Sequence, residues 1–139
     1  MLRTLILFAL LSAPTVAAAA ELTLTIENIR NDRGKVRVAI YADSDSFLQK
    51  GQEIAARQSD AATGTMVLHF QALVADTFAV ALHHDEDDDG QVDTNLFGIP
   101  TEGVGFSNNV TGIFGPPVFS DAMVTITRGD DSALTIRLN

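Results

Sequence analysis

Apolar and polar residues alternate along most of the chain after residue 20, and this period of two is typical of β-strands with one buried face. The polar turn at residues 31–34 predicts a hairpin between the first two apolar runs, and the turn at 128–131 predicts a second hairpin between the last two. In chain order the apolar positions are Leu22, Leu24 and Ile26; Val36, Val38 and Ile40; Met66, Leu68 and Phe70; Phe78, Val80 and Leu82; Ala122, Val124 and Ile126; and Leu134, Ile136 and Leu138.

These runs and the turns between them predict an all-β fold, an antiparallel β-sandwich of about seven strands whose inner faces form the core. Residues 43–58 predict a long connection with one helical turn, capped by Asp45 and Ser46 and continued at residues 53–57. Residues 61–65 are small and polar and predict a loop. The chain of 139 residues has the length of one domain.

The first 20 residues have the pattern of a secretory signal peptide, with Arg3, an apolar run at 5–11 and small residues at 17–20. We therefore expect residues 1–20 to be a signal peptide and residues 21–139 a single β-sandwich domain, exported to the periplasm or the extracellular space. The apolar run is too short for a spanning helix and no later segment is a candidate, so we expect no membrane insertion.

The composition narrows the range of partners. Nine Lys and Arg residues stand against 18 Asp and Glu residues, a net charge of −9. Loss of Arg3 with the leader would leave 8 minus 18, or −10. Nucleic acids and anionic membrane surfaces are poor partners for this charge. The chain contains no cysteine, which excludes disulfides and thiol chemistry.

An acidic stretch at residues 85–93 carries the clearest chemical signal, because oxygen ligands recur at alternate positions as they do in calcium loops. Gly90 stands at the sixth place, where such loops turn sharply. The predicted ligands are the carboxylates of Asp85, Asp87, Asp89 and Asp93 and the backbone carbonyl of Gln91. Glu86 and Asp88 are expected to point outward.

The motif departs from the calcium hand at its twelfth place, where Leu96 replaces the bidentate glutamate. Asn95 or Glu102 could supply a sixth ligand, and spacing alone does not choose between them. The flanking pattern is a strand before and a loop after, not two helices. The alternative is a solvated acidic turn between two strands.

Residues 93–119 are rich in glycine and proline and also carry many large apolar residues. This combination predicts a long ordered loop system over one end of the sandwich. It either presents a binding surface or merely closes the sandwich end.

Residues 84–100, with residues 102–109 and the Gly-Pro-Pro of 115–117, resemble the DUF2141 family of exported bacterial proteins. The resemblance covers almost the whole chain after the leader. It implies a small exported β-sandwich of the prealbumin-like or immunoglobulin-like kind, and the family name supplies no activity. The family's acidic loop has asparagines at its third and fifth places, where this chain has Asp87 and Asp89, and it also has an apolar residue at the position of Leu96.

Other chemistries are less well supported by the sequence. His83 and His84 are adjacent on a strand and point to opposite faces, so they do not chelate zinc together, and His69 lies elsewhere. Ser107 lacks a nucleophile elbow or a placed histidine. We therefore expect a binding or structural protein of the cell envelope with an unknown protein, glycan or small ligand as partner. The alternatives are a hydrolase or accessory enzyme that uses the loop carboxylates, and a carrier of small ligands.

Overall fold

The computed structural model describes residues 20–139 except 72, 74 and 128, so the predicted signal peptide lies outside the described residues apart from its last position. Strands dominate the regular structure of the described chain, which also has one short 3-10 helix, η1 (Ser107–Asn109), and one short α-helix, α1 (Phe119–Ala122). The strands are β1 (Glu21–Ile29), β2 (Lys35–Tyr41), β3 (Ala55–Asp60), β4 (Gly64–Gln71), β5 (Thr77–Asp85), β6 (Val104–Phe106), β7 (Val124–Thr125) and β8 (Ser132–Arg137).

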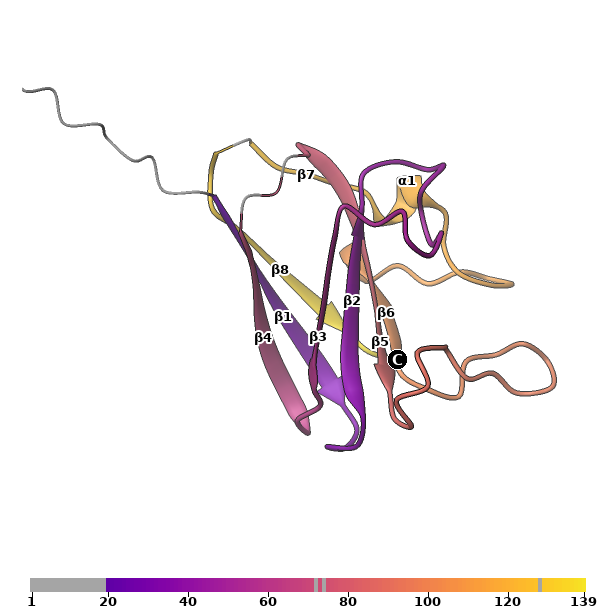
Figure 1. Ribbon diagram of the computed structural model, residues 1–139. Coiled ribbons are helices and arrows are strands. Elements are labelled where there is room, and N and C mark those ends of the chain that lie inside the picture. The colour runs from indigo at the N-terminus through magenta and orange to yellow at the C-terminus, as the bar shows by residue number, and fades with distance from the viewer. Residues whose placement is uncertain (1–19, 72, 74, 128) are drawn as a thin grey trace, which may run out of the picture.

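Two sheets pack face to face, which confirms the predicted all-β sandwich (Figure 1). One sheet has the order β4-β1-β8 and the other the order β3-β2-β5-β6, with the short β7 also paired to β5. The pairs are antiparallel except β1 with β8, which is parallel. The described residues contain no helix of the length and apolarity needed to cross a bilayer.

Both predicted hairpins are wrong. Strands β1 and β2 are consecutive but lie in different sheets, and so do β7 and β8. The register of β1 shifts between Glu27 and Ile29, where Asn28 has a positive φ of 66°, and the chain then crosses to the other sheet. An alternating pattern specifies which face of a strand is buried but not which neighbour it pairs with, because both sheets bury their apolar face in the same core.

The connection predicted at residues 43–58 is also partly wrong, because it contains the start of β3 instead of a helical continuation. Strand β3 lies at the edge of its sheet and is mostly exposed, so it lacks apolar alternation. The helical turn itself is present, since the amide of Phe47 donates to the carbonyl of Asp43 at 3.1 Å. Its cap is Asp43, whose carboxylate accepts from the amide of Ser46 at 2.8 Å, and not the predicted Asp45 and Ser46.

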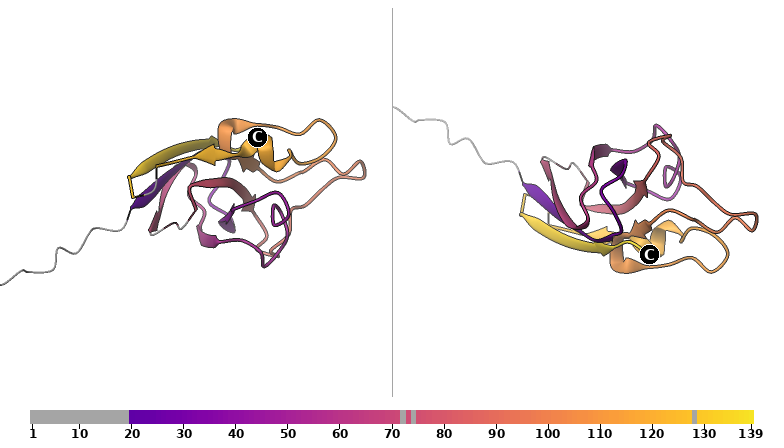
Figure 2. Two further views of the ribbon diagram at one scale, coloured as in Figure 1. Left: turned by 90° about the horizontal axis from the view of Figure 1, so that it is seen from above. Right: turned by 90° about the horizontal axis from the view of Figure 1, so that it is seen from below.

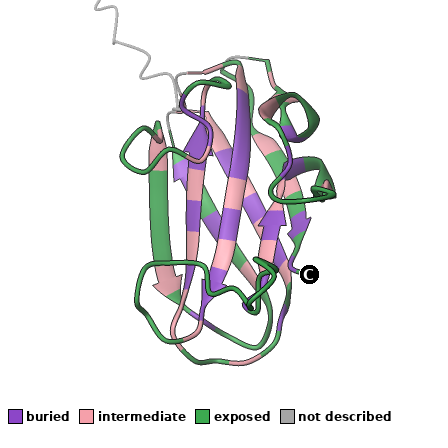
Figure 3. Cartoon of the chain, turned by 90° about the vertical axis from the view of Figure 1, so that its right-hand side faces the viewer, coloured by how far each residue is buried: buried purple, intermediate pink, exposed green. Residues whose placement is uncertain are grey.

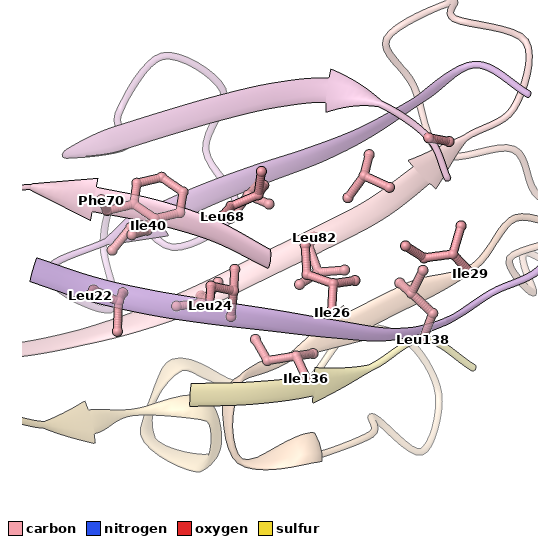
Figure 4. Close-up of a cluster of buried hydrophobic side chains, with 14 of the residues drawn as sticks. Leu22, Leu24, Ile26, Ile29, Ile40, Leu68, Phe70, Leu82, Ile136 and Leu138 are labelled. Carbon is pink, nitrogen blue, oxygen red and sulfur yellow. The ribbon is translucent and has the colours of Figure 1, made fainter. Parts of the chain in front are cut away.

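The main core lies between the two sheets and consists largely of the predicted inward positions of β1, β2, β4, β5 and the last apolar run (Figure 4). Ile29 and Ala61 join this core although the sequence pattern did not predict them. Full burial of each large aliphatic side chain contributes about 1.5–3 kcal/mol relative to exposure. The fully buried large apolar residues of this core include Leu22, Leu24, Ile26, Val36, Ile40, Phe78, Val80 and Ile136.

A second apolar cluster covers part of the outer face of the β3-β2-β5-β6 sheet. It is built on Tyr41 and Ala79 and is closed by Phe47 from the turn after β2 and by Ala122 from α1. The rings of Tyr41 and Phe47 meet edge to face with centroids 5.6 Å apart. This cover extends over one end of the outer face, and the acidic loop follows the other end of β5.

The segment after β6 is fixed by polar side chains. Ser107 is fully buried, accepts the amide of Val80 at 2.9 Å and donates to the carbonyl of Ala122. Asn108 and Asn109 bond backbone groups of neighbouring segments. Two loops, residues 86–102 and 110–118, project from the same side of the molecule (Figure 2). Most of their residues are exposed, as the view onto that side shows (Figure 3).

Candidate metal centre

Asp85 ends β5 and holds the start of the acidic loop. Its side chain is fully buried, and its two carboxylate oxygens accept the backbone amides of Asp89 at 3.1 Å and Gly90 at 2.9 Å. The Nε–H of Arg37, on the neighbouring strand β2, donates to the same carboxylate. Burial would raise the pKa of Asp85, but Arg37 and the two amides outweigh it and keep the pKa below the ordinary value.

The next acids wind the loop tightly. The carboxylate of Asp87 accepts the amide of Asp89 at 3.2 Å, and that of Asp89 accepts the amide of Gln91 at 2.8 Å. These are turns in which an aspartate bonds the backbone two residues ahead. Gly90 has the expected positive φ, at 80°, and Asp88 has a φ of 60°.

Three acids of the stretch are paired with basic side chains from β2 and from the turn before it. Glu86 accepts from Arg30, Arg33 and Asn31, and Asp88 accepts from Lys35 and Arg37. The pKa of Glu86 is lowered chiefly by Asn31 and Arg33, and that of Asp88 chiefly by Lys35. Asp85 is the third, through Arg37. The side chains of Glu86 and Asp88, which were predicted to point outward from the loop, thus form ion pairs with Arg and Lys side chains.

Glu102 follows the acidic stretch in the sequence and folds back onto it. It is buried, and its two carboxylate oxygens accept the amides of Glu86 at 2.7 Å and Asp93 at 3.2 Å. Asn95 does not do this, because its side-chain oxygen accepts the amides of Phe97 and Ile99 and closes the exposed turn at residues 95–99. Of the two residues left open as a sixth ligand, the structure brings Glu102 and not Asn95 to the acidic stretch.

Among the residues that the structure describes, three groups of side chains could hold a metal ion, each with its candidate ligand atoms within 4.8 Å of one another. Asp85, Asp87 and Asp89 form one group, as the alternating pattern predicts. Asp87 also belongs to a second group with Asp93 and Glu102. The third group is His83, Asp85 and Glu102. The carboxylates of residues 85, 87, 89, 93 and 102 are therefore contiguous, with Asp87 shared by the two all-carboxylate groups.

The charge at Asp87 is not compensated by a basic residue. In the described part of the chain, Asp87, Asp89, Asp93 and Glu102 form no ion pair with Lys or Arg. The pKa of Asp87 is raised, first by partial desolvation and then by the negative charges of Asp89 and Asp93. Asp87, Asp93 and Glu102 also line a surface hollow, together with Arg30, Arg33 and Glu86.

The two adjacent histidines lie on opposite faces of β5, as expected. His84 is fully buried toward the core and bonds the carbonyl of Arg33 through Nε2 at 2.7 Å. His83 faces outward with Asp85, and burial is the largest cause of its lowered pKa. The sequence places His83 close to Asp85 but pairs it only with His84 as a chelator, whereas the structure groups His83 with Asp85, two residues further on the same strand face, and with Glu102.

The fold and this site define a β-sandwich domain with an acidic loop that groups carboxylates at one end. Residues 24–133 match the family model DUF2141, described as an uncharacterized protein conserved in bacteria, and the chain belongs to this family. No curated protein and no solved structure matches the chain.

Proposed function

We propose that this chain is an exported β-sandwich module of the cell envelope whose acidic loop binds calcium as a structural ion. The observation that carries the proposal is the pair of carboxylate groups that share Asp87, the first with Asp85 and Asp89 and the second with Asp93 and Glu102. Of these acids, only Asp85 has an ion pair with a basic side chain of the described chain. Hard oxygen donors at this density suit a divalent cation such as calcium.

Asp85, Asp87, Asp89 and Asp93 would supply side-chain oxygens, the carbonyl of Gln91 another, and Glu102 the sixth ligand. The buried position of Glu102 supports this role, because its backbone hydrogen bonds hold the carboxylate still beside Asp93. A rigid set of ligands loses less conformational freedom when the ion binds.

The ion would fix the segment that follows. Asp93 also accepts the amide of Thr101 through its carbonyl at 2.8 Å, and Thr94 pairs with Pro100 in an isolated bridge. The metal site therefore stands at the base of the projecting loop and would hold it to the sandwich. In this proposal the module presents residues 99–119 to an envelope partner.

Thermal unfolding of the chain from Glu21 onward, which contains every strand, tests the calcium site. Extracellular calcium modules have dissociation constants of about 10⁻⁴ to 10⁻³ M, so about 10 mM calcium is 10 to 100 times the constant. The ion then adds about 1.4–2.7 kcal/mol to the free energy of unfolding. For a domain of about 120 residues this raises Tm by about 6–11 °C relative to EDTA.

Two asparagine substitutions one residue apart make the test specific. Asp87→Asn removes charge from the crowded group, so in EDTA it should be more stable than the parent and should lose the calcium increment. Asp88→Asn breaks the ion pairs with Lys35 and Arg37, so it should be less stable in EDTA but keep the increment. No calcium-selective rise in Tm, or an equal rise with magnesium, would refute the calcium site.

A further inference from the structure

The two projecting loops end in the same short pattern. Residues 96–100 are Leu-Phe-Gly-Ile-Pro and residues 113–117 are Ile-Phe-Gly-Pro-Pro, so an apolar residue, Phe and Gly recur with Pro at the fifth place. We call residues 94–100 the first tip and residues 111–117 the second tip. Both project from the same side of the molecule, away from the start of β1 (Figures 1 and 2).

The apolar side chains of both tips are almost completely exposed. The exposed fraction is 101% for Leu96, 86% for Phe97, 88% for Ile113 and 102% for Phe114. Single exposed apolar residues are common, but two Phe-containing tips on one side of a molecule mark an interaction surface.

The shape of the tips favours a deformable partner. They project from the body of the molecule (Figure 2), and two surface hollows, one beside the acidic loop and one beside Asn109 and the last residues of the chain, include no residue of either tip. A small ligand at the tips would therefore bind outside both of these hollows. A glycan would need stacking and hydrogen-bonding groups, and neither tip contains Trp or Tyr. Two separate projecting apolar tips fit a fluid lipid surface, which needs no preformed hollow to receive them.

The charge around the tips and their distance from the acidic stretch indicate which kind of lipid surface they fit. Residues 94–101 and 103–120 contain no charged side chain, and no Lys or Arg occurs from residue 91 to residue 127. The tips therefore enter an apolar phase without burying charge. The nearest cations, Arg30 and Arg33 at the base of the first loop, are paired with Glu86 among the acids, so they give little attraction to an anionic headgroup layer. Leu96 stands three residues beyond Asp93, about 10 Å in extended chain, and shallow interfacial anchors enter by about 5–10 Å.

We propose that the first and second tips dock this domain onto a zwitterionic lipid surface by shallow insertion of their apolar side chains. This inference rests on the proposed envelope-binding role, and it names the partner. It differs from a spanning segment, because only the tips enter the interface and the carboxylates at the base of the first tip stay outside.

The chain contains no tryptophan, so a single Trp at a tip reports its surroundings. Phe97→Trp and Phe114→Trp should each shift their emission to the blue with phosphatidylcholine vesicles, and brominated phosphatidylcholine should quench them. Val67→Trp is the control, because Val67 is half exposed on β4 outside the tips and should show neither effect. Phe97→Ser with Phe114→Ser should lower the vesicle partition coefficient at least about 100-fold, about tenfold for each lost ring.

The vesicle titrations are run in calcium, and the calcium shift in Tm is measured on the same variants. A normal calcium shift with no emission change would overturn the lipid inference and leave the calcium site standing. An emission change without any effect of calcium on Tm would support lipid docking by the tips while refuting the calcium site. A blue shift that grows with protein concentration in the absence of vesicles would assign the tips to a second copy of the chain and overturn the inference.

Discussion

Replacing Arg37 with glutamine should test how the acidic loop is held to the sandwich. The Asp85 side chain is 0% exposed and that of Arg37 28% exposed, and the two form an ion pair between β5 and β2. Removing one partner of a buried pair costs about 3–5 kcal/mol, because the other charge stays buried without compensation. The partial exposure of Arg37 and the two amides that still bond Asp85 place the cost near the lower end, about 3 kcal/mol.

Urea unfolding in EDTA measures this cost, and Lys35→Gln is the matched control. Lys35 lies on the same strand and pairs with Asp88, whose side chain is 41% exposed, so its loss should cost less than about 1 kcal/mol. A cost of about 3 kcal/mol corresponds to a fall in Tm of about 12 °C for a domain of about 120 residues.

The double variant Arg37→Gln with Asp85→Asn separates the charge from the packing. If the buried charge is the cause, the double variant should lose clearly less than the sum of the two single losses, because the orphaned carboxylate is gone. Additive losses, or a loss in Arg37→Gln no larger than in Lys35→Gln, would refute the reasoning.

Two further substitutions test other contacts of the fold. Ser107→Ala should lower the free energy of unfolding by about 1–3 kcal/mol in urea titrations, because the buried amide of Val80 loses its acceptor; a loss under about 0.5 kcal/mol would contradict this. Gly34→Ala should cost about 2–4 kcal/mol, since its Cβ would lie 1.9 Å from the Asp85 carbonyl oxygen at a φ of 63°. Gly51→Ala, with a φ of 83° and no atom within 4 Å, should cost only the backbone strain of about 1 kcal/mol, and equal losses in both variants would contradict the clash.

The buried face of most strands could be predicted from the sequence, but strand pairing could not. Leu22, Leu24 and Ile26 alternate with polar residues, and this fixes their inward face in any sandwich. The sheet in which β1 lies depends on contacts with β4 and β8, about 45 and 110 residues further along the chain. Turn residues at 31–34 are equally compatible with a hairpin and with a crossing between sheets.

Strand β3 could not be recognised from the sequence because an exposed edge strand lacks the alternation of apolar and polar residues. It pairs only with β2 and exposes Ala56, Arg57 and Gln58. Arg57 reaches across to the carbonyl of His69, and Gln58 accepts from Arg37. Edge strands of this kind are stabilised by backbone pairing and polar side chains, so they carry little hydrophobic period.

The acidic stretch shows which parts of the site the spacing of residues in the sequence can predict. Alternation within residues 85–89 was enough to group Asp85, Asp87 and Asp89, because these residues are close in the chain. Spacing did not choose between Asn95 and Glu102, since that choice depends on how the chain folds back after residue 93. The loop returns through the bond from Thr101 to the carbonyl of Asp93, which sets Glu102 beside the acids.

The division of the acids into paired and unpaired sets argues against a merely solvated turn. A solvated turn would scatter its charges toward water, whereas here Glu86 and Asp88 are directed to cations about 50 residues earlier in the chain. The same strand supplies Arg37 to Asp85 but supplies no cation to Asp87. The fold therefore neutralises Asp85, Glu86 and Asp88, which fasten the loop, and leaves Asp87 and Asp93 without a basic partner in the described chain. Asp87 and Asp93 face a hollow that Arg30, Arg33 and Glu86 also line. The mutual repulsion of Asp87 and Asp93 persists in the folded domain unless a cation binds there, and this connects the loop's own geometry to the proposed calcium site.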